Sequence, residues 1–493
     1  MSNNHSQYKY SRKDIARIAT IAMTDRGLEP EFSKAAIQQL ASINSPGEDQ
    51  DPNIFDLTHL LWCSLDNDDS RDLDQLTVCE ELKNGLVKIF IAVADVDSLV
   101  KKGSAIDDHA LINTASIYTS ARIFPMLPEK LSTDLTSLNP NEDRLAVVTE
   151  MVVKNDGSIT QPHVYRAKVR NKAKLAYDSI SDWIENKSTA PEALSKVQGM
   201  AQQLLIQDRT AQILRKRRHE QGSLELEIFE PKAIFEGDQV VRIEQQIQNR
   251  GRQLIEEFMI ATNECTAKFL AVQGHPSLRR VVRSPESWSR IVEHAKKYGE
   301  TLPSQPDSKA LSKFLAKRHE ADPLRFPDLS LVIVKLMGSG EYVVEQPGEE
   351  PIGHFGLAVQ DYTHSTAPNR RYPDLITLRM IKGALQKTDP LYSNADLQIL
   401  AEHCSRQEDA ARKVERRVRK SEAALLLTSH INQTFDAIVT GKSISATWVR
   451  IFDIPVEGLL INGMPDLEVG RKLRVKLVST NVEKGFIDFI QIN

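Results

Sequence analysis

Five aspartates lie within nine positions of this chain, and they constrain its fold and chemistry more than any other segment. They are Asp66, Asp68, Asp69, Asp72 and Asp74. Like charges this close together repel one another unless a positive group lies among them. The run is therefore either an acidic loop in open solvent or a site that holds a divalent cation.

The surroundings of the run favour the cation site. Acidic runs are usually solvated, but Leu65 and Leu73 interrupt this one and strand-like segments flank it, so we expect it in the body of a domain. On extended chain Asp72 and Asp74 would project to one face, and Asp66 could reach the same point across a turn. Carboxylate oxygens suit Mg²⁺, Mn²⁺ or Ca²⁺ rather than zinc.

A calcium loop of the EF-hand type is the weaker interpretation of the same run. Counted from Asp66, such a loop needs glycine at its sixth position and glutamate at its twelfth. The chain has Arg71 and Thr77 at those positions. Both the sharp turn and the bidentate ligand are missing, which argues against a calcium loop.

The 493 residues are enough for about three domains, and their composition is that of an ordinary globular protein. The four cysteines are far apart and form no Cys-x-x-Cys pair, which argues against a zinc site or a disulfide framework. The first residues contain no apolar signal segment, and no stretch is apolar enough to span a membrane. We expect a cytoplasmic protein without a membrane span.

The net charge of −4 is not that of a generic nucleic-acid binder, which tends to be basic. The charge is distributed unevenly, however. Residues 51–110 are strongly acidic, whereas basic residues cluster at 215–218, 279–280, 370–371 and 412–420. A negative pocket approached over positive surfaces would bind a cation and a polyanion together.

The beginning of the chain predicts a small helical module over residues 1–50. Apolar residues within 11–43 are spaced for two short helices, broken by Gly-Leu-Glu-Pro at 27–30. Two such helices suit a helix-turn-helix-like module, although a simple packing appendage is the commoner outcome. A polar linker over 44–55 follows.

Residues 51–432 predict one large α+β domain, because helix-like and strand-like segments alternate without a change of composition. It ends in a long helix, expected over 396–431, whose apolar residues form one stripe among basic ones. Residues 433–493 contain five short strand-like segments, which suit an OB-fold β-barrel, a common platform for single-stranded nucleic acid. Trp448, on the second of these strands, is our candidate RNA-binding residue there.

Several ordered motifs besides the acidic run resemble one known family. They lie at 117–132 (Ile-Tyr-Thr-Ser-Ala-Arg-Ile-Phe-Pro and onward), 137–146, 255–263 (Ile-Glu-Glu-Phe-Met-Ile and onward), 354–358 and 362–375, which contains Arg-Arg-Tyr-Pro-Asp-Leu. Together they are similar to the catalytic domain of the ribonuclease II and ribonuclease R (RNB) exoribonucleases, over roughly residues 56–430, with a family-like OB domain after it. Too few residues precede this domain to encode the N-terminal cold-shock domains of the well-known members, so the chain resembles the shorter bacterial type.

This resemblance implies a processive 3′-to-5′ exoribonuclease, a hydrolase that degrades single-stranded RNA to nucleoside 5′-monophosphates with Mg²⁺, or Mn²⁺ as the alternative ion. It implies Asp66, Asp72 and Asp74 as metal ligands, with Asp72 and Asp74 also catalytic. The family's fourth ligand is usually an aspartate, but this chain has Gln75. An amide oxygen binds Mg²⁺ without contributing a negative charge, so a second ion should be held less tightly.

Further roles follow from the same resemblance. Arg370 would contact the RNA and act in catalysis by neutralising charge on the scissile phosphate. Tyr177 matches a tyrosine of the catalytic pocket, and Tyr118 matches an aromatic residue that stacks on bases. Glu256 or Glu257 would hold the terminal nucleotides, and the sequence does not choose between them. Single-stranded RNA is the expected partner, and we expect a monomer with no obligate protein partner.

The rival interpretation is a binding protein of the same fold. An RNA chaperone or decay adaptor would keep the RNA channel but cleave weakly, because Gln75 removes a charge from the metal site. Asp74 matches the residue on which hydrolysis in the family depends most, and it is present. We therefore favour an active enzyme.

Overall fold

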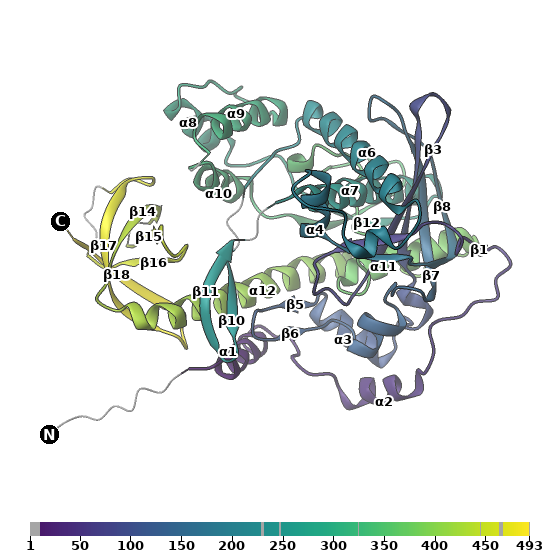
Figure 1. Ribbon diagram of the computed structural model, residues 1–493, viewed down its shortest axis with the longest axis horizontal. Helices are drawn as coiled ribbons and strands as arrows, with labels where there is room; N and C mark the ends of the chain where they lie inside the picture. Colours follow the sequence, from purple (N-terminus) through teal and green to yellow (C-terminus); the bar gives the residue numbers. More distant parts are fainter. Residues whose placement is uncertain are drawn as a thin grey trace.

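A computed structural model describes residues 10–227, 231–245, 248–323, 325–443, 445–462 and 467–492. Its centre is a seven-stranded sheet (Figure 1). The two outer pairs of the sheet are parallel, and its other neighbouring strands are antiparallel. In order across the sheet the strands are β1 (Phe55–Asp56), β8 (Ile159–Arg170), β7 (Asp143–Val153), β4 (Val87–Ala94), β3 (Gln75–Glu81), β2 (Cys63–Asp66) and β9 (Ala173–Ala176).

Strand β4 explains why the sheet lies in the middle of a larger body. Its sequence is a nearly continuous apolar run, Val-Lys-Ile-Phe-Ile-Ala-Val-Ala. Side chains alternate between the two faces of a strand, so Ile89 and Ile91 enter one core while Phe90 and Ala92 enter the other. The first core is completed by α6 (Met200–Gln221) and α7 (Arg250–Val272), and the second by α3 (Ala105–Asn113) and α11 (Tyr372–Gln386). We call this assembly the sheet body.

Helix α12 (Asn394–Leu427) runs from the sheet body to the C-terminal barrel (Figure 1). It starts two residues before the expected position, because a capping box sets its first turn: the Ser393 N–H donates to the Asp396 carboxylate, and the Asp396 N–H donates to the Ser393 hydroxyl. It ends at Leu427, four residues before the expected end, and one 3₁₀ turn follows. The predicted long helix is therefore present with shifted ends.

The last part of the chain is a closed five-stranded barrel. The five strand-like segments that the sequence predicted form its five strands, and in β15 buried residues alternate with partly buried ones. The α+β class, with a large domain followed by this barrel, is confirmed. Around the barrel the strands are β14 (Thr434–Lys442), β15 (Thr447–Ile451), β16 (Glu457–Leu460), β18 (Phe486–Ile492) and β17 (Lys472–Asn481).

The N-terminal helices pack against different parts of the molecule, which corrects the helix-turn-helix-like interpretation. Helix α1 (Arg12–Thr24) buries Ile15 and Ile18 in one core with α12 and the barrel. Helix α2 (Lys34–Ser42) instead buries Ala36 in the core of the sheet body, beside α3. The spacing of apolar residues predicted both helices, but it carries no information about which distant surface covers each one.

Smaller parts lie outside the seven-stranded sheet and the barrel, among them two hairpins and a group of three helices. A two-stranded hairpin, β10 (Pro231–Glu236) and β11 (Gln239–Gln245), packs on α12 and was not predicted. Three helices, α8 (Trp288–Lys297), α9 (Ser308–Ala321) and α10 (Phe326–Met337), share a core of their own. A short hairpin, β5 (Ile117–Tyr118) and β6 (Ile123–Phe124), lies beside α12. Among the described helices none is both long and apolar enough to cross a membrane.

Candidate active site

The acidic run forms the loop between β2 and β3. Asp66 ends β2, and β3 begins directly after Asp74, so the sheet fixes both ends of the loop. Asp74 is buried, with 1 % of its surface exposed, and Asp72 is partly buried. Asp68 and Asp69 face solvent. The structure therefore divides the run into an exposed middle and two ends that belong to the protein interior.

Asp74 pairs with Arg370 at the inner end of this loop. One carboxylate oxygen accepts a hydrogen bond from the backbone N–H of Asn369 at 2.9 Å, and the other lies 3.2 Å from Nε of Arg370. Burial raises the pKa of Asp74 to about 7, although the charge of Arg370 opposes the rise. Burial would lower the pKa of Arg370, but the charges of Asp74 and of the other acidic groups around it together outweigh this effect, and the net shift is upward. Arg370 thus stays a cation, with 42 % of its side chain open to solvent.

Tyr118 reaches the same loop from the hairpin β5–β6. Its hydroxyl donates a hydrogen bond to the Asp72 carboxylate at 2.8 Å. Burial of the hydroxyl, and then the charge of Asp72, raise the pKa of Tyr118, so the hydroxyl remains a donor. The side chain is still 42 % exposed. A ring in this position offers surface on which a base could stack.

Asp66 lies at the other end of the loop. One of its oxygens accepts hydrogen bonds from the Asn67 N–H at 2.7 Å and from the Ser70 hydroxyl at 3.0 Å. Burial nevertheless raises its pKa. The neighbouring Asn67 side chain accepts a hydrogen bond from Arg252 of α7 at 2.7 Å, which ties the loop to that helix.

Tyr177 lies on the Asp66 side of the site, at the start of α4 (Tyr177–Ile184). The guanidinium of Arg252 lies over its ring, 4.6 Å from the centroid. Burial and the charge of Asp66 raise the pKa of the tyrosine hydroxyl. Gly251 permits this arrangement, because a Cβ there would lie 2.9 Å from the Tyr177 carbonyl oxygen.

The acidic residues have the donor chemistry of a site for a hard divalent cation. Asp66, Asp72 and Asp74 offer carboxylate oxygens and Gln75 an amide oxygen. In addition to burial, the charge of Asp72 raises the pKa of both Asp66 and Asp74, and a cation would neutralise this excess charge. Within the described ranges, no three His, Cys, Asp or Glu side chains form a ready metal-binding group. The oxygen donors and the negative charge suit Mg²⁺, but these side chains do not converge on one point in this structure, so the metal remains a prediction.

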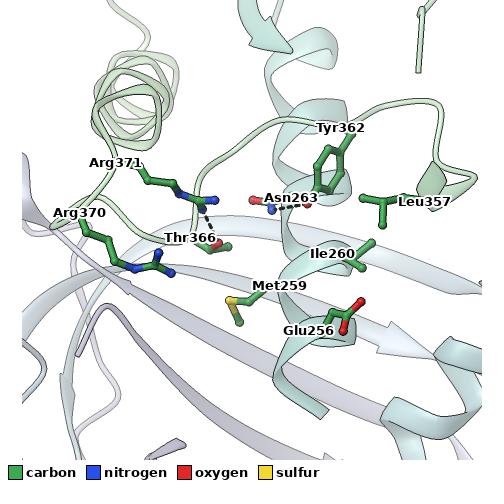
Figure 2. A pocket seen from close by; sticks show the side chains of 9 residues that line it. All are labelled: Glu256, Met259, Ile260, Asn263, Leu357, Tyr362, Thr366, Arg370 and Arg371. Carbon is green, nitrogen blue, oxygen red and sulfur yellow. Dashed lines mark hydrogen bonds between the residues drawn. The ribbon is translucent and has the colours of Figure 1, made fainter. Parts of the chain in front are cut away.

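A pocket of about 240 Å³ opens beside this loop (Figure 2). Arg370 and Arg371 reach it from the segment before α11, and α7 contributes Glu256 with two apolar neighbours. Cationic, carboxylate and apolar groups thus line one cavity, which suits a nucleotide with its phosphate, ribose and base. The residues lining it are Glu256, Met259, Ile260, Asn263, Leu357, Tyr362, Thr366, Arg370 and Arg371.

The structure distinguishes the two glutamates that the sequence left open. Glu256 lines the pocket and accepts a hydrogen bond from Gln248 at 2.8 Å. Glu257 is buried in an ion pair with Arg218, whose Nε lies 3.0 Å from its carboxylate. Arg218 also donates a hydrogen bond to the Ser223 hydroxyl. The Glu257 side chain is thus engaged in the contact between α6 and α7. Glu256 is therefore the glutamate placed to meet a ligand.

Sequence reasoning assigned no role to several residues that shape this site. Asp374 accepts hydrogen bonds from the N–H groups of Thr366 and Ala367, both at 2.8 Å, and from Arg371 at 2.7 Å. It therefore fixes the loop that carries Arg370. All of these residues lie inside the motif at 362–375, and that motif was the only feature of the sequence that could have pointed to their role.

Trp448 lies on β15 of the barrel and is not among the residues that line the pocket. Its ring packs beside Gly441, where a Cβ would lie 3.4 Å from it. If Trp448 contacts RNA, it does so from the barrel and not from the pocket. This contact stays a prediction.

Two family models match this chain. Residues 55–387 match the RNB domain, and residues 433–491 match the RNase II-type exonuclease C-terminal S1 domain. Ribonuclease R of Vibrio parahaemolyticus is 28% identical over an alignment of 513 positions, which covers 95% of this chain and 60% of that relative. The chain thus spans about 60% of the length of this relative.

Solved structures share the fold. The apo form of Mycoplasma genitalium RNase R matches with a TM-score of 0.87 and 22% identity, over 97% of this chain and 78% of that one. The same enzyme has also been solved with ribose-methylated single-stranded RNA. A yeast protein described as a pseudonuclease matches less closely, with a TM-score of 0.68 and 16% identity over 94% and 57% of the two chains. Because the RNB domain alone accounts for more than half of the chain, this protein belongs to the RNB family.

Proposed function

We propose that this protein is a 3′-to-5′ exoribonuclease that hydrolyses single-stranded RNA processively to nucleoside 5′-monophosphates, with Mg²⁺ or Mn²⁺. The observation that carries the proposal is the Asp74–Arg370 pair, 3.2 Å apart, whose arginine lines the pocket and whose carboxylate lies within the influence of the charge of Asp72. Membership of the RNB family and the relatives named ribonuclease R support the same activity.

In this proposal the 3′-terminal nucleotide occupies the pocket and its phosphate meets Arg370. The oxygen of a water molecule attacks phosphorus, and the bond from phosphorus to the 3′ oxygen of the preceding nucleotide breaks. The leaving oxygen takes up a proton, and the new P–O bond stays on the released 5′-monophosphate. Arg370 stabilises the charge that builds up on the phosphate oxygens.

Other side chains hold the strand in line for this step. Tyr118 stacks on a base near the 3′ end, and such stacking contributes roughly 1–3 kcal/mol per base. Glu256 accepts hydrogen bonds from hydroxyls of the terminal ribose, which only RNA offers at the 2′ position. Asp66, Asp72, Asp74 and Gln75 would hold the cation, which when bound supplies a water of lowered pKa and screens the phosphate charge.

The direct test uses single-stranded RNA labelled at its 5′ end. Incubation with Mg²⁺ should shorten the labelled strand stepwise from the 3′ end and release 5′-monophosphates, and incubation with EDTA should leave it intact. Intact RNA under both conditions would contradict the proposal.

Replacement of Asp74 by asparagine tests the role of the pair with Arg370. Asp74→Asn removes the charge but keeps an acceptor for the Asn369 N–H, so we expect cleavage to fall by at least about a thousandfold while the RNA dissociation constant changes by less than about threefold. Asp69→Asn is the matched control, because Asp69 belongs to the same acidic run but faces solvent. Parallel loss of binding and cleavage would contradict the assigned role.

A second candidate function is an RNA-binding protein or decay adaptor with weakened catalysis. Gln75 favours it, because this residue lowers the charge available for a cation, and the fold also occurs in the yeast pseudonuclease. Protection of labelled RNA without shortening, in Mg²⁺ and in Mn²⁺, would support this function over the first.

A further inference from the structure

The hairpin β5–β6 carries Tyr118 to the acidic loop, and its two ends are held differently. Ile117 and Phe124 at its base are buried in the core that α1 shares with α12 and the barrel. The Tyr118 side chain is 42 % exposed, and its hydroxyl meets Asp72. A half-exposed ring is not fixed by packing alone, so its position depends on the backbone that carries it.

Helix α1 grips the turn of this hairpin from one side. Nε of Arg12 donates a hydrogen bond to the carbonyl of Ala121 at 3.3 Å, and its Nη2 donates to the carbonyl of Ser120 at 3.2 Å. A guanidinium presents a planar fork of donors, which suits two neighbouring carbonyls. The segment after α1 adds another contact, since Arg122 of the hairpin donates to Glu31 at 2.6 Å.

The Arg12 side chain is itself held in place. Its guanidinium lies 5.3 Å from the centroid of the Phe235 ring on the hairpin β10–β11. Its backbone N–H donates to the carbonyl of Asp238 in the turn of that hairpin at 3.0 Å. Figure 1 shows α1, β5–β6 and β10–β11 gathered beside α12. Arg12 therefore connects three segments that are far apart in the sequence.

Helix α12 grips the same turn from another side. Its Glu422 is buried, with 1 % exposed, and accepts a hydrogen bond from the Ser120 hydroxyl at 3.3 Å. About two turns earlier on the same helix, Glu415 accepts from the Tyr118 N–H at 3.4 Å. The turn is thus clamped between an N-terminal cation and carboxylates of α12.

We propose that Arg12, together with Glu422, is a positioning residue that fixes the Tyr118 hairpin over the acidic loop, so that the N-terminal helix forms part of the RNA clamp. This inference rests on the proposed function. Arg12 does not contact the substrate in this proposal, and it acts through the hairpin backbone. It gives the N-terminal helix a role in place of the helix-turn-helix-like module that the sequence suggested.

Substitutions at Arg12 in the full chain test the inference. Arg12→Ala removes both hydrogen bonds to the turn, and Arg12→Lys keeps one donor. Arg17→Ala is the matched control, because Arg17 lies on the same helix but pairs with Glu483 of the barrel end instead of the hairpin. Thermal unfolding of each variant establishes that the fold is retained.

The first readout is hydrogen exchange of the backbone amides at 117–124, which needs no activity. We expect exchange in this segment to rise by about tenfold in Arg12→Ala, to an intermediate level in Arg12→Lys, and to be unchanged in Arg17→Ala. Glu422→Ala should increase exchange in the same segment. Unchanged exchange in Arg12→Ala would overturn the inference.

The second readout is kinetic. In the proposed function Tyr118 stacks on a base and does not contact phosphorus, so Arg12→Ala should raise the KM for single-stranded RNA about threefold to tenfold while kcat changes less than about twofold. The rise should vanish in a Tyr118→Ala background, since Arg12 acts through Tyr118. An additive rise in that background would overturn the inference.

The two readouts separate this inference from the proposed function. If the unmodified protein does not shorten RNA, the exchange measurement still applies, and the dissociation constant of fluorescein-labelled RNA in EDTA replaces KM. In that case the proposed function fails while the positioning role stands. If RNA is shortened but Arg12→Ala behaves like Arg17→Ala in both readouts, only the positioning role fails.

Discussion

Gln75 is the residue at which this acidic set departs from the pattern that its family resemblance implies. It follows Asp74 directly and begins β3, with 9 % of its surface exposed. Gln75→Asp adds a carboxylate, and because a cation is attracted more strongly to a charge than to an amide dipole, we expect Mg²⁺ to bind about fivefold to tenfold more tightly. Calorimetric titration with Mg²⁺ measures this without RNA.

Gln75→Asn is the control for this substitution, since it changes the length of the side chain but not its charge. Equal Mg²⁺ affinity in the Asp and Asn variants and in the unmodified protein would mean that residue 75 does not reach the cation.

Glu422 is a buried acid whose titration should appear in the stability of the fold. Burial raises its pKa from 4.5 to about 7, although the Ser120 hydroxyl and the charge of Arg419 oppose the rise. The unfolded chain ionises this group at its ordinary pKa, so the stabilisation is complete below that value and is lost as pH rises through about 7. Glu422→Gln should therefore be more stable than the unmodified protein by about 1–3 kcal/mol at pH 8.5, and this difference should shrink towards pH 5.

Urea unfolding at pH 5 and pH 8.5 measures the difference. A stability gap that does not depend on pH would contradict the shifted pKa and would indicate a packing effect of the amide instead.

The place of a single residue in the site could be predicted from the sequence only where its neighbours along the chain determine that place. Asp72 and Asp74 were predicted to lie close together because two positions separate them, and the structure places both beside the same loop end. Glu256 and Glu257 are adjacent on a helix and point about 100° apart. The structure buries Glu257 against Arg218 of another helix and leaves Glu256, which also lies 3.7 Å from Arg218, at the pocket. No local pattern contains that information.

Helices and strands, too, could be predicted only where the local sequence determines them. The five strands of the barrel were predicted individually, whereas for the sheet body the sequence predicted only that strand-like and helix-like segments alternate and that strand-like segments flank the acidic run. The hairpin β10–β11 has its own turn at Gly237, where φ is +59°, and this glycine was an available signal that was not used. The partner of α1 could not be predicted, because α12 begins hundreds of residues later and spacing within a helix does not name its partner.

The whole molecule is held together by α12. Its first half packs in the core of the sheet body, where Leu397 and Ala401 are buried. Its second half belongs to another core, in which Val414 and Val418 meet α1 and the barrel. A substitution that destabilises α1 should therefore destabilise the barrel more than it destabilises the seven-stranded sheet.

Ile18→Ala tests this division of the molecule. Ile18 is fully buried between α1 and its partners, so its truncation leaves a cavity and should lower the free energy of unfolding of this part by about 2–5 kcal/mol. Hydrogen exchange should rise in α1, in the second half of α12 and in the barrel, and should stay unchanged in the strands of the sheet body. Ile37→Ala is the control, because Ile37 on α2 is 55 % exposed and its truncation should cost less than about 0.5 kcal/mol. A rise confined to α1 would mean that the barrel is stable without it, and a uniform rise over all strands would mean that the two cores unfold as one cooperative unit.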